Sequence, residues 1–391
     1  MSDNCFWTNE VGCIELCAQG PAYVLVTPDD LPVDGLDTNP YGFGDSAAMS
    51  GDFVVVGHPS SDATYDNGRA LAFERSGESW VLSDTLVPSW DGSESDGRFG
   101  SKVAADGDYF VVAAEVAKRV CVFHRSGGSW TEQASLQPAG VDENTVERFA
   151  EGDLAIAGDY LIVGAYNDDD GTYNFTGAAY VYSRSGGTWS QAQKLKPAGL
   201  APDGRFGVSV AMFGDLAIIG AERRIGGSSS EGVAYIFRRS GGTYALEAEL
   251  LASDRQSYEY FGEQVAITDD YAFVSAISGL YVFERSGSSW IESYKFTSPI
   301  PGPSGVLWLS SWKEMVLSGN LLFISGNPAP DAQSVPVNEA VFVFEKVVGG
   351  SWEYRETLVG PTYSMDTEFA NDLSLSGNTI FASKVDTVPP V

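Results

Sequence analysis

A short segment that recurs six times limits what this chain can fold into. Most copies read Arg-Ser-Gly, then one or two small residues, then Trp or Tyr, and they occupy residues 74–80, 124–130, 183–189, 238–244, 284–290 and, in eroded form, 346–352. Each copy lies between two short apolar runs, which is typical of a strand, a tight turn and a strand. The glycines reach the positive φ of such a turn at little cost because they lack a Cβ atom. A repeat of this kind predicts a propeller or a solenoid.

The hairpin belongs to a longer unit that begins near residues 41, 99, 149, 206, 261, 311 and 369, at intervals of 50 to 58 residues. Each unit contains a Phe-Gly pair or a variant of it, a strand, a Gly-Asp-like turn, a second strand, a loop and then the hairpin. In the first complete unit we expect strands at 45–50, 53–57, 69–73 and 80–86. The second strand is apolar on both faces, as expected of a strand sandwiched between neighbouring sheets.

The two ends of the chain carry complementary parts of one unit. The seventh unit supplies only two strands before residue 391, whereas residues 22–26 resemble the third strand of a repeat with no first half before it. Pairing of residues 22–26 beside residues 379–383 would close a ring and remove the open sheet edges. The sequence therefore predicts an all-β, seven-bladed propeller of four-stranded blades. We expect a Cys-bearing tail at residues 1–19 and one domain from residue 20 to 391, its last blade closed by the N-terminal strand.

Charge and hydropathy exclude several kinds of partner. The chain has 53 acidic and 23 basic residues, a formal charge of −30, so a phosphate backbone would be repelled and nucleic acid is not expected as a partner. No apolar run approaches 18 residues, so membrane insertion is not expected. The N-terminus lacks a basic segment followed by an apolar one, so no signal peptide is predicted, and an intracellular protein and a processed or excised form are both open.

The four cysteines fall into two groups. Cys5, Cys13 and Cys17 lie in the N-terminal tail, where one disulfide plus a spare thiol and a fully reduced state are both open. Cys121 lies within an apolar run and is interpreted as a small core residue.

The repeated Phe-Gly, Gly-Asp, Val-Val-Gly-Ala and Gly-Ala-Ala-Tyr-Val-Tyr elements resemble the FG-GAP repeat family, known from the propellers of integrin α subunits. The Arg-Ser-Gly-Gly-Ser-Trp hairpin is more similar to the variety found in secreted or surface proteins of bacteria and microalgae. The resemblance covers roughly residues 20–385, although Phe-Gly is Phe-Ala in units three and seven and is lost in unit six. It implies a non-enzymatic recognition or adhesion module, extracellular or at the cell surface. Such a module would bind protein or glycan partners through loops on one propeller face.

The resemblance also implies a candidate calcium site in the loop at residues 166–172. In the family this loop can carry an Asp-x-Asp-x-Asp-Gly motif, in which alternating side chains converge on one ion and Gly permits the turn. The residues concerned are Asn167, Asp168, Asp169, Asp170 and Gly171. The downstream acidic ligand is absent, because Asn174 stands near its place. Three adjacent aspartates favour Ca²⁺, with an affinity on the order of 10⁻⁴–10⁻³ M, whereas Asp is also common in turns without any metal.

Three further residues are candidate contact or modification sites. Asn174 begins an N-glycosylation sequon in the same loop. Trp308 and Trp312 lie in a segment, 299–312, that breaks the repeat, and they are the predicted aromatic patch for a partner. The hairpin arginines and tryptophans are interpreted instead as structural, because they mark equivalent positions of successive repeats.

Three functions remain open, of which recognition or adhesion is the first. The second is a structural subunit of a larger assembly, such as a surface appendage, a sheath or a virion, with the N-terminal tail and residues 299–312 at the contacts. The third is a propeller hydrolase or lyase. No Gly-x-Ser-x-Gly elbow or phosphate-binding loop is present, and the two histidines, His58 and His124, lie in different units, so we do not expect an enzyme.

Overall fold

The computed structural model describes most of the predicted propeller and none of the N-terminal tail. The described residues are 24–27, 30–32, 42–59, 68–90, 97–139, 149–168, 175–200, 202–223, 231–297, 300–302, 305–329, 340–347, 350–359 and 367–386. Everything that follows refers to these residues. Cys5, Cys13 and Cys17 lie outside them.

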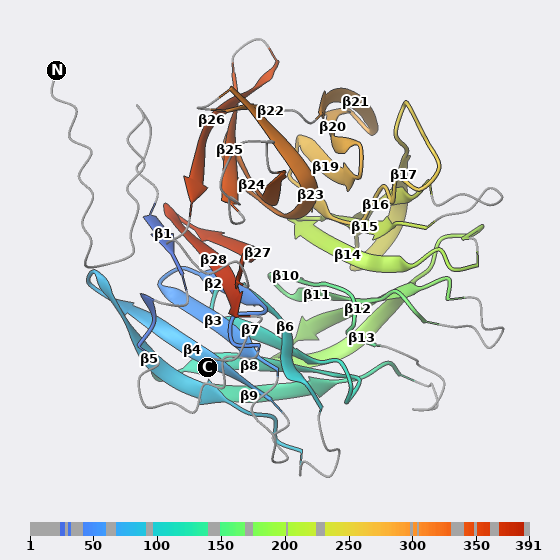
Figure 1. The fold of residues 1–391 in the computed structure, drawn as a ribbon. Coiled ribbons are helices and arrows are strands. Elements are labelled where there is room, and N and C mark those ends of the chain that lie inside the picture. The colour runs from blue at the N-terminus through green and yellow to red at the C-terminus, as the bar shows by residue number, and fades with distance from the viewer. Residues whose placement is uncertain are drawn as a thin grey trace, which may run out of the picture.

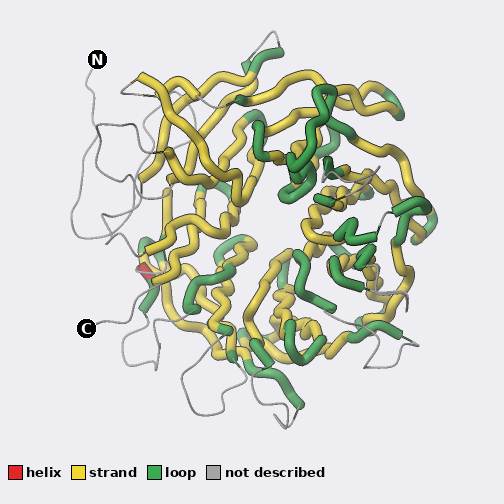
Figure 2. The backbone as a smooth tube through the Cα atoms, turned by 45° about the vertical axis from the view of Figure 1, so that its right-hand side comes forward, coloured by secondary structure: helices red, strands yellow, loops and turns green. Residues whose placement is uncertain are grey.

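The described strands form seven sheets arranged in a ring, which confirms the predicted all-β propeller (Figures 1 and 2). The first five blades have four antiparallel strands each, with consecutive strands paired in order. Their bounds are β2 Ala47–Ser50, β3 Phe53–His58, β4 Arg69–Ser76 and β5 Ser79–Leu86 in blade one; β6 Phe99–Asp106, β7 Tyr109–Ala114, β8 Arg119–Ser126 and β9 Ser129–Leu136 in blade two; β10 Leu154–Ala157, β11 Tyr160–Ala165, β12 Ala178–Ser185 and β13 Thr188–Leu195 in blade three; β14 Phe206–Phe213, β15 Leu216–Ala221, β16 Val233–Ser240 and β17 Thr243–Leu250 in blade four; and β18 Val265–Ile267, β19 Tyr271–Ala276, β20 Gly279–Ser286 and β21 Ser289–Phe296 in blade five.

The last two blades depart from this plan. Blade six gains a strand, because the segment that breaks the repeat forms β22 Ile300–Gly302 and the first part of β23 Gly305–Ser318, followed by β24 Leu321–Ala329, β25 Ala340–Lys346 and β26 Trp352–Val359. Blade seven has three described strands, β27 Thr367–Ser376, β28 Thr379–Asp386 and β1 Val24–Val26. The N-terminal strand closes the ring as predicted, with Val24 opposite Thr379, and it runs parallel to β28 (Figure 1).

The core lies between the blades. The second strands are buried on both faces, so that Val54, Val55 and Val56 of β3 are all fully buried. Each hydrophobic cluster joins residues of two adjacent blades, as when Val111 and Val122 of blade two pack with Leu161 and Val163 of blade three. No blade could bury both faces of its sheet alone, so closure of the ring also completes the core.

The outer hairpins show how the blade edges are protected. In each of the first six blades the pairing between the last two strands shifts by one residue, at Phe73, Phe123, Tyr182, Phe237, Phe283 and Phe344. A bulge of this kind twists the outer strand and makes its edge a poor template for pairing with another chain.

The Phe-Gly motif joins a blade to the blade before it at Phe99, Phe206 and Phe261. Gly177, which precedes β12, forms a parallel bridge with Phe206 of the next blade, and the amide of Phe206 donates to the Thr176 carbonyl across 3.0 Å. Gly177 has φ +82°, and a Cβ atom there would lie 2.1 Å from the Phe206 carbonyl oxygen. The repeat therefore keeps glycine where two backbones meet closely.

The hairpin arginines also join adjacent blades, which confirms their structural interpretation. The Arg125, Arg184 and Arg239 guanidinium carbons lie 4.3, 3.9 and 4.0 Å from the ring centres of Phe53, Tyr109 and Tyr160. Each of these rings belongs to the first residue of the second strand of the preceding blade, in β3, β7 and β11. Cation–π contacts thus recur between neighbouring blades.

The hairpin tryptophans lie in the same joints. Trp189 packs edge-on against Tyr109 of the preceding blade, with ring centres 6.2 Å apart, and Trp352 packs likewise against Tyr271 at 5.9 Å. These tryptophans serve inter-blade packing, as predicted.

Candidate functional site: a polar ring in the central channel

Every blade places a polar residue at the same position of its innermost strand. In each sheet the fourth residue of the second strand pairs with an apolar inner-strand residue, for example Val56 with Ala47 and Val112 with Val103. The residue just before that apolar partner is polar in all seven blades. We call these seven residues the polar ring: Ser46, Lys102, Asp153, Ser209, Gln264, Glu314 and Asp372.

At two joints, polar-ring residues of adjacent blades contact one another. The Lys102 ammonium lies 3.0 Å from Asp153 Oδ1, which links blades two and three. The Ser46 hydroxyl donates to Asp372 Oδ2 across 2.8 Å and accepts a 3.0 Å hydrogen bond from the Val103 amide, so that blades seven, one and two are tied together. The polar ring therefore lies at a single level of the channel.

The charges of the polar ring do not balance. Lys102 is its one cation, whereas Asp153, Glu314 and Asp372 are three acids. Asp153 holds the pKa of Lys102 well above its usual range, so Lys102 remains an ammonium and cannot act as a general base. Burial, with the nearby charges of Asp372 and Asp153, raises the pKa of Glu314 well above its usual range. Burial likewise raises the pKa of Asp372, against the opposing effect of Lys102.

Five members of the polar ring line a cavity of about 370 Å³ in the channel: Ser46, Lys102, Asp153, Glu314 and Asp372. Apolar residues of the inner strands, including Met49 and Leu154, complete its wall. The cavity is large enough for a polar group of a ligand, such as one sugar ring or the end of a long side chain. Carboxyl oxygens and a serine hydroxyl would meet that group with a surplus of hydrogen-bond acceptors.

Sequence reasoning missed the polar ring, although a signal was present. Aligning the units on their Gly-Asp turns places a polar residue at one fixed distance before the turn in every unit, next to residues that are mostly apolar. A single polar residue in an inner strand has no obvious meaning. Seven at one position in a closed ring must meet at one level of the channel.

The predicted calcium loop is described only in part. Asn167 and Asp168 are both buried, whereas Asp169, Asp170, Gly171 and the sequon residue Asn174 lie outside the described residues. The Asp168 carboxylate accepts hydrogen bonds from the Tyr180 hydroxyl and from the Lys194 ammonium, the latter at 3.0 Å. Within the described ranges no three His, Cys, Asp or Glu side chains form a group that could hold a metal ion. The calcium site stays a prediction.

The predicted aromatic patch is placed only by its backbone. Trp308 and Trp312 belong to β23, where Trp308 pairs with Ala329 and Trp312 with Gly326, and the register shifts on either side of Trp312. The segment that breaks the repeat is thus part of the sixth sheet. A partner contact at these two residues stays a prediction.

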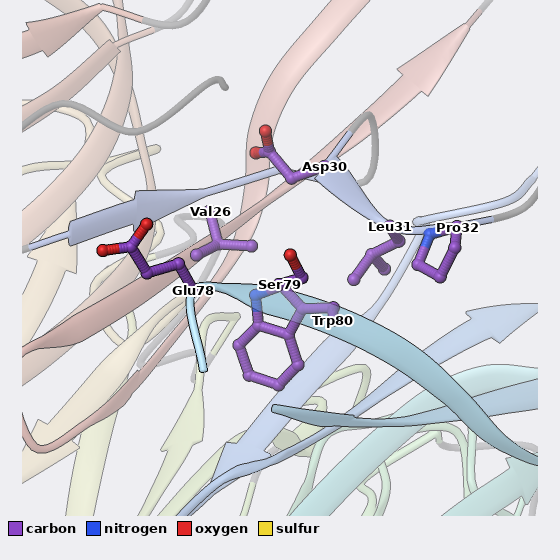
Figure 3. Close-up of a pocket in the computed structure, with 7 residues that line it drawn as sticks. All are labelled: Val26, Asp30, Leu31, Pro32, Glu78, Ser79 and Trp80. Carbon is purple, nitrogen blue, oxygen red and sulfur yellow. The ribbon is translucent and has the colours of Figure 1, made fainter. Parts of the chain in front are cut away.

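A second, smaller cavity of about 170 Å³ lies where the N-terminal strand meets the first hairpin (Figure 3). The buried side chains of Val26, Leu31 and Trp80 surround it, and the carboxylates of Asp30 and Glu78 point outward. Asp30 accepts hydrogen bonds from the backbone amide and hydroxyl of Thr27, at 2.7 and 3.0 Å, so it fixes the turn after β1. This cavity is therefore a feature of the contact by which the N-terminal strand closes the ring.

A comparison with protein families identifies the repeats. The family model described as FG-GAP repeat matches residues 130–182, 189–237 and 244–291. Each matched segment begins in the outer strand of one blade and continues into the next blade. The chain is a seven-bladed propeller that contains FG-GAP repeats. The resemblance seen in the Phe-Gly and Gly-Asp elements is therefore confirmed.

Solved structures of similar fold support the propeller architecture of this chain and carry no information about its function. A putative 6-phosphogluconolactonase from Bacteroides fragilis is 13% identical, with a TM-score of 0.53, over 81% of this chain and 84% of that one. A second, from Bacteroides uniformis, is 14% identical with a TM-score of 0.52, over 81% and 85%. Sqt1 from Chaetomium thermophilum is 12% identical with a TM-score of 0.50, over 90% and 96%.

No curated protein matches the sequence. In the part of the chain that the structure describes, no helix has the length and apolar character needed to cross a membrane.

Proposed function

We propose that this FG-GAP propeller is a non-enzymatic recognition or adhesion module, extracellular or at the cell surface, that binds a protein or glycan partner. The observation that carries the proposal is the 370 Å³ cavity lined by the polar ring. It is a concave site, formed by strands from several blades, with hydrogen-bonding groups that converge on its centre. FG-GAP repeats, which occur in adhesion propellers, support the same assignment.

The charge of the site favours a particular ligand chemistry. Lys102, which contacts Asp153, is the one cation of the polar ring, so its three acids exceed its cations by two. A sugar hydroxyl or an ammonium group of a partner donates hydrogen bonds to the oxygens of such acids. A phosphorylated ligand would instead meet the repulsion of a chain with formal charge −30.

The test is a binding screen with a matched pair of variants. The purified protein would be applied to a glycan array and to a peptide array of graded lysine content. Each hit would be repeated with Glu314→Gln and with Glu78→Gln, which removes one exposed charge at a hairpin tip. We expect saturable binding that weakens by up to about tenfold in Glu314→Gln and is unchanged in Glu78→Gln, since one hydrogen bond contributes roughly 0.5–1.5 kcal/mol.

Two outcomes would overturn the proposal. Turnover of a lactone such as 6-phosphogluconolactone, lost in Glu314→Gln, would make the channel a catalytic site in which the raised pKa of Glu314 serves a general acid. Regular self-assembly in sedimentation experiments, with no binding on either array, would favour the structural-subunit alternative. Calcium assistance of binding stays a prediction.

A further inference from the structure

The first aspartate of the predicted calcium loop, Asp168, is in contact with a cation of the protein itself. Lys194 Nζ, on the outer strand β13, lies 3.0 Å from both carboxylate oxygens of Asp168. The Tyr180 hydroxyl, on β12, donates to Oδ2 of the same carboxylate. Burial and the bond to Asp168 hold the pKa of Tyr180 well above its usual range, so this hydroxyl keeps its proton and remains a donor.

This arrangement does not suit Asp168 as a calcium ligand. Calcium takes six to eight oxygen ligands at about 2.3–2.6 Å, and a ligating carboxylate turns its oxygens toward the ion. Both oxygens of Asp168 already face donors, and the side chain is only 2% exposed. An ion bound to them would also be repelled by the Lys194 ammonium at short range.

Blade five repeats the arrangement. Lys295 Nζ lies 2.8 Å from Asp254 Oδ2 and 2.6 Å from the Tyr281 hydroxyl, which donates to Asp254 Oδ1 across 2.7 Å. Tyr281 pairs with Lys295 as Tyr180 pairs with Lys194, at equivalent positions of the third and fourth strands. The hydrogen bond from Lys295 is the main reason that the pKa of Asp254 lies below its usual value.

The two carboxylates come from different parts of a blade. Asp168 follows the second strand of its own blade, whereas Asp254 follows β17, the outer strand of the preceding blade. The tyrosine–lysine pair is therefore common to both blades, whereas the carboxylate that it contacts comes from a different loop in each. In blade five the equivalent loop is only Ile277 and Ser278, with no acidic residue between β19 and β20, so the pair there serves no calcium loop.

We infer that Lys194 takes the place of a metal cation at Asp168, and that the tyrosine–lysine pair is a metal-independent clamp for a loop carboxylate in blades three and five. The clamp holds the loop at its base, where the Asp168 carbonyl accepts a 3.1 Å hydrogen bond from the Gly177 amide. Gly177 is also the residue that meets Phe206 of the next blade. The clamp therefore secures the joint between blades three and four.

The experiment measures thermal melts of the full chain in 5 mM CaCl₂ and in 1 mM EDTA. The variants are Lys194→Met, Asp168→Asn and their combination, with Lys295→Met as the matched change in blade five. We expect the wild-type melting temperature to be the same in both buffers. Lys194→Met should lower it by at least about 5 °C, because it leaves a buried carboxylate without its cation.

The other variants separate the clamp from a general loss of packing. The combination of Lys194→Met with Asp168→Asn should regain part of the loss, since no charge is then buried. Asp168→Asn alone should be milder than Lys194→Met, because the Lys194 side chain is 36% exposed and can be solvated. Lys295→Met should also be milder, because the Asp254 side chain is 48% exposed.

Either of two results would overturn the inference. One is a wild-type melting temperature that rises in calcium and no longer does so in Asp168→Asn, which would make Asp168 a metal ligand. The other is a Lys194→Met variant as stable as the wild type. If Lys194→Met fails to fold, the wild type and Asp168→Asn in the two buffers still decide between the lysine and the metal.

Discussion

The guanidinium group of Arg75 donates a 3.0 Å hydrogen bond to the hydroxyl of Thr379, which joins the first blade to the last. Elsewhere in the ring the equivalent arginines join blades that are adjacent in the chain. Here the same position of the repeat joins residues more than 300 positions apart, and the Ser46–Asp372 bond does the same inside the channel. Closure of the ring is therefore reinforced by the contacts that build every other joint.

A double-mutant cycle can measure this closing contact. Arg75→Met and Thr379→Val should each lower the free energy of unfolding by about 1 kcal/mol, because each removes one partner of a partly buried hydrogen bond. The double variant should lose less than the sum, by roughly 0.5–1 kcal/mol. Urea denaturation gives all four values, and strict additivity would show that the contact does not contribute to closure.

The polar ring predicts an unusual pH dependence. A carboxyl whose pKa is higher in the folded chain binds its proton more tightly when folded, so stability increases as the pH falls through that pKa toward the unfolded value of about 4.3. Burial raises the pKa of both Glu314 and Asp372 in this sense. The wild type should therefore be less stable at pH 9 than at pH 6.

Glu314→Gln should remove much of this pH dependence and be more stable than the wild type at pH 9, because the polar ring then has one carboxyl fewer to ionise. Urea denaturation from pH 5 to 9 checks both expectations, with Glu78→Gln as the control for loss of one acidic residue. Wild type and Glu314→Gln curves of the same slope would contradict the assignment.

The Phe-Gly joint predicts a difference between two glycines of one blade. Gly177→Ala should lower the free energy of unfolding by about 3 kcal/mol, since its Cβ atom would meet the Phe206 carbonyl at 2.1 Å. Gly186 in the hairpin has φ +58° and no atom within 4 Å of such a Cβ, so Gly186→Ala should lose only about 1 kcal/mol. Chemical denaturation of the two variants decides the matter, and equal losses would place the cost in the backbone angle alone.

The burial of Cys121 predicts an unreactive thiol. The residue is fully buried, and burial together with the charge of Glu132 raises the pKa of its thiol, so little thiolate is available for reaction. In a variant with Cys5, Cys13 and Cys17 changed to serine, a maleimide should label the denatured chain promptly and leave the native protein unlabelled for hours. Rapid labelling of the native protein would place Cys121 outside the core.

The sequence alone determined the repeat, and with it most of the fold. Glycines at hairpin turns, paired apolar runs and complementary half-units at the two ends were enough to predict seven blades and closure by residues 22–26, because these features act through local turn geometry and the need to bury both faces of a blade. The same reasoning correctly assigned Arg125 and Trp189 to structure, since residues that recur with the repeat serve what recurs in the fold.

Only the tertiary structure decided which side chains meet. Lys102 faces Asp153, and Ser46 reaches Asp372, because neighbouring blades are packed in register around a channel. The repeat aligns these residues in the sequence, but only the packed ring decides which of them are in contact. The predicted calcium ligand Asp168 meets Lys194 because β13 lies beside β12 in the same sheet. Local spacing predicted a cluster of negative charge, and the position of one lysine on a neighbouring strand determined what neutralises part of it.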